Sequence, residues 1–416
     1  MRSPLQAALV EAIAPYCEAP RRRRGPPRRR ASGSASPAAP PVLPALSPQA
    51  WRQIGRDVLA LHEGYTQRSG PFAHEGNPIH ARLVAYQLYY LPRNWYRVYR
   101  VLQELPWEAP AGAFPPAAWL DSSAGAPSLR LLDLGCGTGA FSLAWLAWLA
   151  ETRAPPGAPL ELHLTLVDQG HTLLGLAEAN IRAFARRALP GVALRLETHA
   201  DGVGAFLTGG AAGAPYGVLG AAMTLNELSL LGPRRVSERA IALADALQAR
   251  ARPGACLLFV EPGTRRGFMN LMALREHLLH LPVLYPCPHA LPCPMWGGAV
   301  RHWCHATERL PAAFFFDAAL KRHAGLAFDM RDLQLSALAV QAMPAAAAAS
   351  PFVPRHGERI VSAPLKPRDA PDPQLPAARE RVVLACAPDG KLHERPAPSG
   401  GPYTRGRWAP AVRPAP

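Results

Sequence analysis

Residues 131–139 constrain the fold of this chain more than any other segment. They read LLDLGCGTG, a short apolar run that leads into Gly135, Gly137 and Gly139, and the apolar run 140–149 follows. Glycine permits a tight turn and lets the backbone approach a ligand closely. A strand that enters such a turn and leaves it as a helix is typical of the ligand-binding edge of an open α/β sheet. We therefore expect a strand, a glycine loop and a helix here.

Strand-like and helix-like runs alternate between residues 128 and 265. Short apolar runs predict strands, and longer runs with apolar residues every three or four positions predict helices. This alternation is typical of a doubly wound, mostly parallel sheet, so the expected fold class is α/β and Rossmann-like. The expected strands are 128–134, 160–168, 193–198, 218–224, 255–261, 333–341 and 380–385, and the expected helices are 172–188, 268–281 and 310–323.

Composition divides the chain into four expected parts. Residues 1–47 are rich in Pro, Ala and Arg, which predicts a mostly disordered basic arm with a short helix at 4–14. The other expected parts are an N-terminal helical region (48–110), the α/β domain (111–343) with a cysteine-rich insertion (282–310), and a linker with a small C-terminal β element (344–416).

Three amphipathic runs predict separate helices in the N-terminal helical region. The first covers 51–61, where apolar residues recur at helical spacing. The second, 78–91, is expected to end at Pro92, because proline has no backbone N–H to continue a helix. Asn94 is then expected to cap the third helix, 95–105.

The third of these runs is rich in aromatic and basic residues, which leaves two interpretations. The residues concerned are Trp95, Tyr96 and Tyr99 among Arg93, Arg97 and Arg100. They could stack on RNA bases and grip the phosphates. Alternatively, the aromatic side chains face the core and only the arginines face solvent.

The formal net charge of +15 lies mainly at the two ends of the chain. Residues 1–50 hold eight Arg against two Glu, and residues 343–416 hold eleven Lys or Arg against six Asp or Glu. Basic arms suit contact with nucleic-acid phosphates, although the codon usage of a GC-rich genome would produce the same Arg-rich composition. The sequence has no apolar run long enough for a membrane span, so no membrane partner is expected.

Three acidic residues stand where a nucleoside cofactor meets such a sheet. Asp133 precedes the glycine loop, Asp168 ends the next strand, and Asp201 follows the third strand. A carboxylate after the second strand can bind the two hydroxyls of a ribose. This arrangement resembles motifs I and II of class I S-adenosylmethionine (SAM) methyltransferases, whereas a dinucleotide site would need the spacing GxGxxG. SAM is therefore the expected cofactor, bound by Asp133, Gly135, Gly137, Gly139, Asp168 and Asp201.

The segment 224–228 follows the fourth strand, where methyltransferases usually carry their catalytic element. It reads TLNEL and contains neither an Asn-Pro-Pro-aromatic element for amino methylation nor a Pro-Cys nucleophile for pyrimidine methylation. Asn226 and Glu227 could orient a substrate, or Asn226 could cap the following helix. The sequence therefore leaves methyl transfer open, with Asn226 and Glu227 as candidate catalytic residues.

Three of the seven cysteines, Cys287, Cys293 and Cys304, fall within one proline-rich stretch. An odd number of cysteines at uneven spacing argues against a disulfide framework. Thiols this dense in a reducing compartment are typical of a metal or iron–sulfur site.

An iron–sulfur cluster usually takes four thiolates, so a fourth ligand is needed. Cys386 ends an expected strand and opens a turn, which makes it the preferred candidate. Cys17 falls in the expected disordered arm, and Cys256 falls inside an expected strand. His289 and His305 are alternative ligands, and they would favour zinc.

Together these features resemble the methyltransferase-like assembly factors of the small ribosomal subunit, which occur in mitochondria and bacteria. The resemblance covers about residues 80–408. Its motifs, taken together in this order, are more specific for the family than any one of them alone. They are Leu91-Pro92, 132–139, Asn226-Glu227-Leu228, Glu261-Pro262-Gly263-Thr264, Cys287-Pro288-His289, Cys293-Pro294, Trp303-Cys304-His305 and Cys386-Ala387-Pro388-Asp389-Gly390. The resemblance implies a 4Fe–4S cluster on Cys287, Cys293, Cys304 and Cys386, with SAM at the glycine loop. It also implies binding to small-subunit rRNA in the pre-ribosomal particle.

The preferred function is an rRNA-binding assembly factor with a structural cluster, acting as a monomer. An active SAM-dependent rRNA methyltransferase is the alternative, and a zinc-binding RNA-binding protein is a lesser one. The Arg-rich N-terminus is similar to a mitochondrial transit peptide, but Glu11, Glu18 and the many prolines fit that class poorly. The bacterial cytoplasm is therefore the expected compartment, with the mitochondrial matrix as the alternative.

Overall fold

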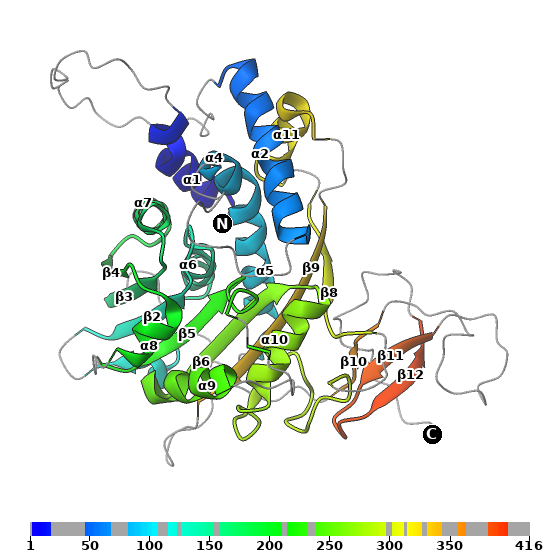
Figure 1. The fold of residues 1–416 in the computed structure, drawn as a ribbon. Coiled ribbons are helices and arrows are strands. Elements are labelled where there is room, and N and C mark those ends of the chain that lie inside the picture. Colours follow the sequence, from blue (N-terminus) through cyan, green and yellow to red (C-terminus); the bar gives the residue numbers. More distant parts are fainter. Residues whose placement is uncertain are drawn as a thin grey trace.

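A large mixed sheet lies between two layers of helices, and a small antiparallel sheet stands beside it (Figure 1). The computed structural model describes residues 2–17, 46–67, 82–106, 115–122, 126–153, 159–209, 214–228, 230–231, 238–296, 302–311, 314–326, 331–342, 357–362 and 382–397. Most of the basic arm and most of the linker expected from the sequence lie outside these residues.

The large sheet has the strand order of a class I SAM methyltransferase. Its central strands are β2 (Ser128–Leu134), β3 (Leu160–Val167), β4 (Val192–His199), β5 (Tyr216–Ala222), β6 (Ala251–Pro262), β7 (Val283–Tyr285) and β9 (Asp332–Gln341). They are ordered β4-β3-β2-β5-β6-β9-β7. The strands from β4 to β6 are parallel, whereas β9 enters antiparallel between β6 and β7. The α/β fold class predicted from the sequence is confirmed.

Short strands extend the large sheet and build the second one. Strand β1 (Leu120–Asp121) pairs with β2, and β8 (Ala306–Arg309) pairs with β9. The small C-terminal sheet consists of β10 (Arg359–Ile360), β11 (Val382–Cys386) and β12 (Leu392–Pro396), all antiparallel. The small sheet therefore contains Cys386 at the end of its central strand.

Helices cover both faces of the large sheet, so its strands are apolar on both sides. One face carries α1 (Arg2–Cys17), α2 (Pro48–Gln67), α5 (Leu91–Glu104), α6 (Ala140–Thr152) and α7 (His171–Ala188), and the other carries α8 (Val203–Thr208), α9 (Glu238–Arg250) and α10 (Arg265–Arg275). Successive strand residues point to opposite faces. In β2, Leu131 joins the first core and Leu132 joins the second. Among the described helices, none combines the length and apolar character that a membrane crossing requires.

The helix predicted at 4–14 is confirmed and is longer, since α1 spans Arg2–Cys17. Its apolar side is buried, with Leu5, Leu9 and Ile13 fully enclosed. It packs against α7, where Arg186 donates to Glu11 at 2.5 Å across the solvent-exposed rim. The first residues of the chain therefore form part of the folded structure.

The breaks predicted at Pro92 and Asn94 are wrong. The short helix α4 (Leu83–Ala85), the π-helical turn η1 (Tyr86–Tyr90) and α5 follow one another without interruption. Pro92 stands in the first turn of α5, where a missing N–H costs little. The π-helical turn before it shifts the hydrogen-bonding pattern by one residue. Asn94 lies inside α5, and its Oδ1 accepts from Arg97.

Trp95 and Tyr99 of α5 belong to the core, which confirms the aromatic half of the second interpretation, whereas its expectation that the arginines face solvent is wrong for Arg93. Trp95 and Tyr99 are buried and stacked with ring centroids 4.9 Å apart. Arg93 is also buried and forms a bidentate ion pair with Asp317 at 2.8–2.9 Å. Arg97 donates to the carbonyl of Gln334. The contacts of these side chains are therefore within the protein, and RNA contact by this helix gains no support from them.

Two other predicted helices have different ends in the structure. Helix α10 begins at Arg265, where the Thr264 side chain accepts from the backbone N–H of Gly267. The helix predicted at 310–323 is shorter, because Leu310 continues the strand pairing by donating to Arg331. Helix α11 (Asp317–Ala324) begins only after this pairing ends.

We predict that Gly220→Ala lowers the free energy of unfolding by about 1–3 kcal/mol through overpacking. A Cβ atom at Gly220 in β5 would lie 1.9 Å from the Leu258 carbonyl oxygen and 2.7 Å from Phe141 Cζ. Urea-induced unfolding of the variant and wild type measures the difference.

Gly175→Ala in α7 is the matched control, since no atom lies within 4 Å of its added Cβ. This variant should be as stable as wild type or more stable by up to about 1 kcal/mol, because alanine favours the helix. Equal destabilisation in both variants would contradict the close contact at Gly220.

Candidate functional site

The glycine loop joins β2 to α6 in a conformation that only glycine adopts easily. Gly135, Gly137 and Gly139 have φ values of 64°, 53° and 92°. A Cβ atom at Gly135 would also lie 2.3 Å from Cγ2 of Thr224. The loop therefore needs glycine for backbone conformation and for space, and its N–H groups stand at the carboxyl edge of the sheet, where ligands of this fold bind.

Asp133, which precedes the glycine loop, is enclosed by the protein and bonded to helix α6. It is fully buried, and its Oδ2 accepts from the Ser142 backbone N–H at 3.1 Å and from Ser142 Oγ at 2.7 Å. Burial raises its pKa to about 7. The carboxyl group thus joins β2 to the first turn of α6, and the cofactor contact expected of Asp133 stays a prediction.

Asp168 stands at the end of β3, half-buried beside the loop. Its Oδ2 accepts from the Gly137 N–H at 2.9 Å, and its Oδ1 accepts from the Gly170 N–H at 2.8 Å. Asp201, after β4, is exposed just before α8. Both residues lie at the carboxyl edge of the sheet, and only Asp168 is bonded to the glycine loop.

The two candidate catalytic residues have different surroundings. The Asn226 amide nitrogen donates to the Met223 carbonyl at 2.8 Å and to Glu261 Oε2 at 3.1 Å in the orientation that pairs donors with acceptors. Glu227 is half-buried; burial raises its pKa to about 7, and nearby Asp168 adds to the shift. Asn226 therefore holds the loop after β5, whereas Glu227 lies near the glycine loop.

Glu261 is a buried acid that the sequence argument noted only as part of a motif. It ends β6, is fully buried, and accepts from the backbone N–H groups of Leu225 at 2.8 Å and Asn226 at 3.2 Å. Burial raises its pKa to about 8. Glu261 thus ties the loop after β5 to the loop after β6.

Tyr86 is a second residue that the sequence argument missed. It comes from η1, and its hydroxyl oxygen lies 3.8 Å from the position a Cβ would take on Gly137. Burial raises its pKa, and the charges of Glu227 and Asp168 act in the same direction. No local pattern marks this position, because the helical region reaches the loop only after folding.

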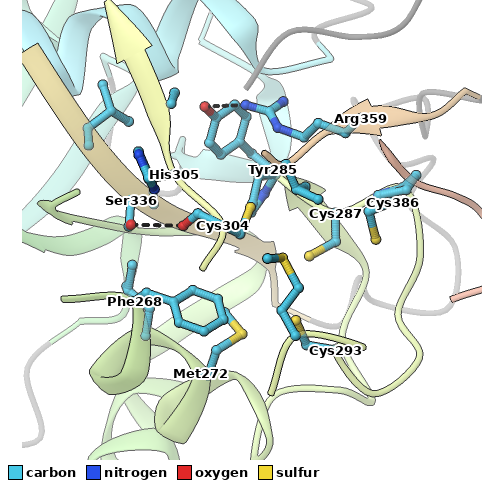
Figure 2. Close-up of a pocket in the computed structure, with 18 residues that line it drawn as sticks. Phe268, Met272, Tyr285, Cys287, Cys293, Cys304, His305, Ser336, Arg359 and Cys386 are labelled. Carbon is cyan, nitrogen blue, oxygen red and sulfur yellow. Dashed lines mark hydrogen bonds between the residues drawn. The ribbon is translucent and has the colours of Figure 1, made fainter. Parts of the chain in front are cut away.

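Cys287, Cys293, Cys304 and Cys386 line one pocket, here called the cysteine pocket (Figure 2). Cys287 follows β7, Cys304 precedes β8, and Cys386 ends β11 in the small sheet. The pocket has a volume of about 550 Å³ including the solvent at its mouth. Its other walls are mostly apolar and include Phe268, Met272 and Met295. Folding therefore brings Cys386 to the three cysteines of the proline-rich stretch.

The four thiols are close enough to influence one another's protonation. Burial raises the pKa of Cys293 to about 12, and Cys287 and Cys304 add to the shift. Burial also raises the pKa of Cys386, and the other three thiols contribute.

The other candidate ligands are placed differently. Cys256 is buried inside β6, and the Cys17 side chain lies outside the described residues. His289 Nε2 forms a hydrogen bond with Cys386 Sγ at 3.2 Å, and the His305 ring lies beside Trp303. In the described part of the chain, no three His, Cys, Asp or Glu side chains form a group that could hold a metal ion.

The cysteine pocket and the glycine-loop edge are connected by hydrogen bonds. Trp303, beside Cys304, donates its Nε1 hydrogen to the Gly263 carbonyl at 2.8 Å. Gly263 lies two residues after Glu261, which binds the loop that carries Glu227. The Cys304 carbonyl accepts from Ser336 Oγ on β9 at 3.0 Å, as Figure 2 shows. A hydrogen bond thus links the segment around Cys304 to the segment that carries Glu261.

Comparison with known families finds similarity over the part of the chain that carries the cysteine pocket and the loop after β5. The family model described as "Mitochondrial small ribosomal subunit Rsm22" matches residues 222–394. These residues include Asn226, Glu227, Glu261 and all four cysteines of the pocket. No curated protein matches the chain.

Solved structures similar to this chain are methyltransferases. One is an arsenic(III) SAM methyltransferase of Chlamydomonas reinhardtii, with 14% identity, a TM-score of 0.29, and coverage of 64% of this chain and 77% of that one. A putative class I SAM-dependent methyltransferase of Listeria monocytogenes has 12% identity, a TM-score of 0.30, and coverage of 72% and 82%. A putative methyltransferase of Thermoplasma acidophilum has 13% identity, a TM-score of 0.30, and coverage of 53% and 70%.

We predict that Glu261→Gln reduces the pH dependence of folding stability. Burial raises the pKa of Glu261 from 4.5 to about 8. Between these two pH values the folded protein therefore binds more protons at this carboxyl group than the unfolded chain does. Stability due to this group is fully present below pH 4.5 and is lost as pH rises toward 8. Urea unfolding at both ends of this range should show a smaller decline in the variant than in wild type.

Glu197→Gln is the control for this comparison, because Glu197 is exposed on β4. It should leave the decline unchanged. The same decline in wild type and Glu261→Gln would contradict a buried, protonated Glu261.

Proposed function

We propose that this chain is an assembly factor of the small ribosomal subunit that binds SAM at the glycine loop and a 4Fe–4S cluster in the cysteine pocket. The observation that carries the proposal is the shared pocket of Cys287, Cys293, Cys304 and Cys386 beside a methyltransferase-type sheet. The match of residues 222–394 to a small-subunit ribosomal family supports the ribosomal part.

The donor set of the cysteine pocket fits an iron–sulfur cluster better than zinc. Its four candidate ligands are all thiols, as such clusters usually require. Each thiolate of a 4Fe–4S cluster binds a different iron atom, so the ligands stand farther apart than those around one ion. Such spacing agrees with four cysteines around one pocket that do not group as ligands of a single metal ion. A bound cluster would cross-link the small C-terminal sheet to the 287–304 segment and so stabilise the fold.

The glycine-loop site fits a cofactor that carries positive charge. Asp168 and Glu227 are half-buried acids there, and the Tyr86 hydroxyl lies beside the loop. SAM carries a sulfonium and an ammonium group, so acidic neighbours favour it. Asp168 would bind the ribose hydroxyls, as expected for an acid after the second strand, and Gly135, Gly137 and Gly139 would let the backbone approach the ligand.

An active SAM-dependent rRNA methyltransferase is the second candidate function. One observation favours it, namely that Glu227 combines a position near the loop with a pKa of about 7. A carboxyl group with such a pKa can accept a proton from a substrate near neutral pH. Asn226 is the weaker catalytic candidate because its side chain is bonded to Glu261.

The partner and the compartment stay predictions. The proposed partners are small-subunit rRNA and the pre-ribosomal particle, bound by a monomer. The bacterial cytoplasm is the compartment expected from the sequence, and the mitochondrial wording of the matched family supports the alternative, the mitochondrial matrix.

We predict that Cys386→Ser lowers the iron and sulfide content of anaerobically purified protein. Serine removes one of the four thiolates that the cluster needs, while wild type should be brown and contain both elements. Elemental analysis, acid-labile sulfide assay and the visible absorption spectrum measure the loss. Cys256→Ala is the control, because Cys256 is buried in β6 and does not line the cysteine pocket. Colourless wild-type protein with stoichiometric zinc would refute the cluster.

We predict that Asp168→Asn weakens SAM binding by roughly tenfold or more, since it removes charge-assisted hydrogen bonds to the cofactor. Isothermal titration with SAM measures the affinity. Asp245→Asn, on the exposed side of α9, should bind as wild type does. Equal affinity in the two variants would argue against the glycine-loop site.

Labelled SAM incubated with small-subunit particles separates the two candidate functions. rRNA binding without methyl transfer is expected for the assembly factor. Methyl transfer that is lost in Glu227→Gln, with rRNA binding retained, would instead favour the enzyme.

A further inference from the structure

Arg275 is a buried cation beside the cysteine pocket. It ends α10 and is fully enclosed, with 0% of its surface exposed. Its Nη2 donates to the Leu291 carbonyl at 2.7 Å and to the His289 carbonyl at 3.2 Å. These two residues lie in the loop between Cys287 and Cys293, so the guanidinium group holds that loop from inside.

The other guanidinium nitrogens of Arg275 lack a partner in the part of the chain that the structure describes. Among the described residues, its Nε and Nη1 have no hydrogen-bond partner, and no carboxylate forms an ion pair with it. A buried cation without an anion is strongly destabilising. The two carbonyls that it binds belong to the loop between Cys287 and Cys293, so the guanidinium group lies against the segment that joins two of the four cysteines.

A second buried guanidinium group, that of Arg359, lines the cysteine pocket itself. Arg359 in β10 is 2% exposed and pairs across the small sheet with Cys386. Its Nη2 donates to the Tyr285 hydroxyl at 2.6 Å, as Figure 2 shows, and its guanidinium carbon lies 4.2 Å from the centre of the Tyr285 ring.

We propose that Arg275 is the buried counter-charge of an anionic four-thiolate centre in the cysteine pocket, and that it raises the reduction potential of that centre and slows its loss. This inference rests on the proposed cluster. Four thiolates carry more negative charge than a 4Fe–4S core carries positive charge, so the complete centre is an anion, and reduction makes it more negative. A fixed cation nearby therefore stabilises the centre, and it stabilises the reduced form more than the oxidised form.

Arg275 has two roles that can be tested separately: it carries a positive charge, and it holds the loop between Cys287 and Cys293. Arg275→Lys keeps the positive charge with fewer N–H donors, whereas Arg275→Gln keeps an amide donor for a loop carbonyl and removes the charge. If Arg275 only braced the loop, the two variants would alter the potential alike.

The test measures iron, sulfide and reduction potential in anaerobically purified full-length protein, together with the rate of iron release to a chelator. Arg275→Gln should have a lower potential and release iron roughly tenfold faster or more, as is typical when an outer partner of a metal site is removed. Arg275→Lys should keep a potential close to that of wild type. The control is Arg250→Gln, because Arg250 also donates to backbone carbonyls, those of Phe206 and Leu207, but away from the cysteine pocket.

Loaded Arg275→Gln with the potential and release rate of wild type would overturn the counter-charge and leave the cluster intact. Equal potentials in Arg275→Lys and Arg275→Gln would also overturn it. If Arg275→Gln does not fold, Arg275→Lys is the only variant needed for the test. A reduction potential of Arg275→Lys below that of wild type would contradict the proposal. Wild-type protein without iron and sulfide would overturn both this inference and the proposed cluster.

Discussion

Strand β9 joins the two candidate sites into one structure. It pairs with β6 on one side and with β7 and β8 on the other. Strand pairing determines which residues lie opposite one another, and a shift by one residue would turn every side chain to the other face. β9 therefore holds the segments before Cys287 and after Cys304 at one edge of the methyltransferase-type sheet, within reach of Cys386 from the small sheet.

The two sites have opposite electrostatic surroundings. The glycine-loop edge gathers the half-buried acids Asp168 and Glu227, which suit the positively charged cofactor proposed there. At the cysteine pocket, buried Arg359 lines the wall and buried Arg275 holds the loop between Cys287 and Cys293, and both suit the anionic centre proposed there. The hydrogen bond from Trp303 to Gly263 connects them.

Local sequence patterns were least informative in the N-terminal helical region. Trp95 and Arg93 suit RNA contact by residue type, but the structure uses them in a core and an ion pair with Asp317. Asp317 follows Arg93 by 224 residues, so no local pattern could reveal the pair. Pro92 likewise predicted a helix break, but α4, the π-helical turn and α5 follow one another without interruption.

The α/β fold class, the glycine loop and the strands that flank it could be predicted from the residues in order, because they depend on short-range apolar periodicity and on the conformational freedom of glycine. The four cysteines also stood out there as candidate ligands. The pocket that Cys386 shares with the other three cysteines, the bonds from Asp133 to helix α6 and the position of Arg275 against the loop between Cys287 and Cys293 are visible only in the folded chain. These arrangements depend on strand pairing and burial between segments far apart in the chain, which local sequence patterns do not reveal.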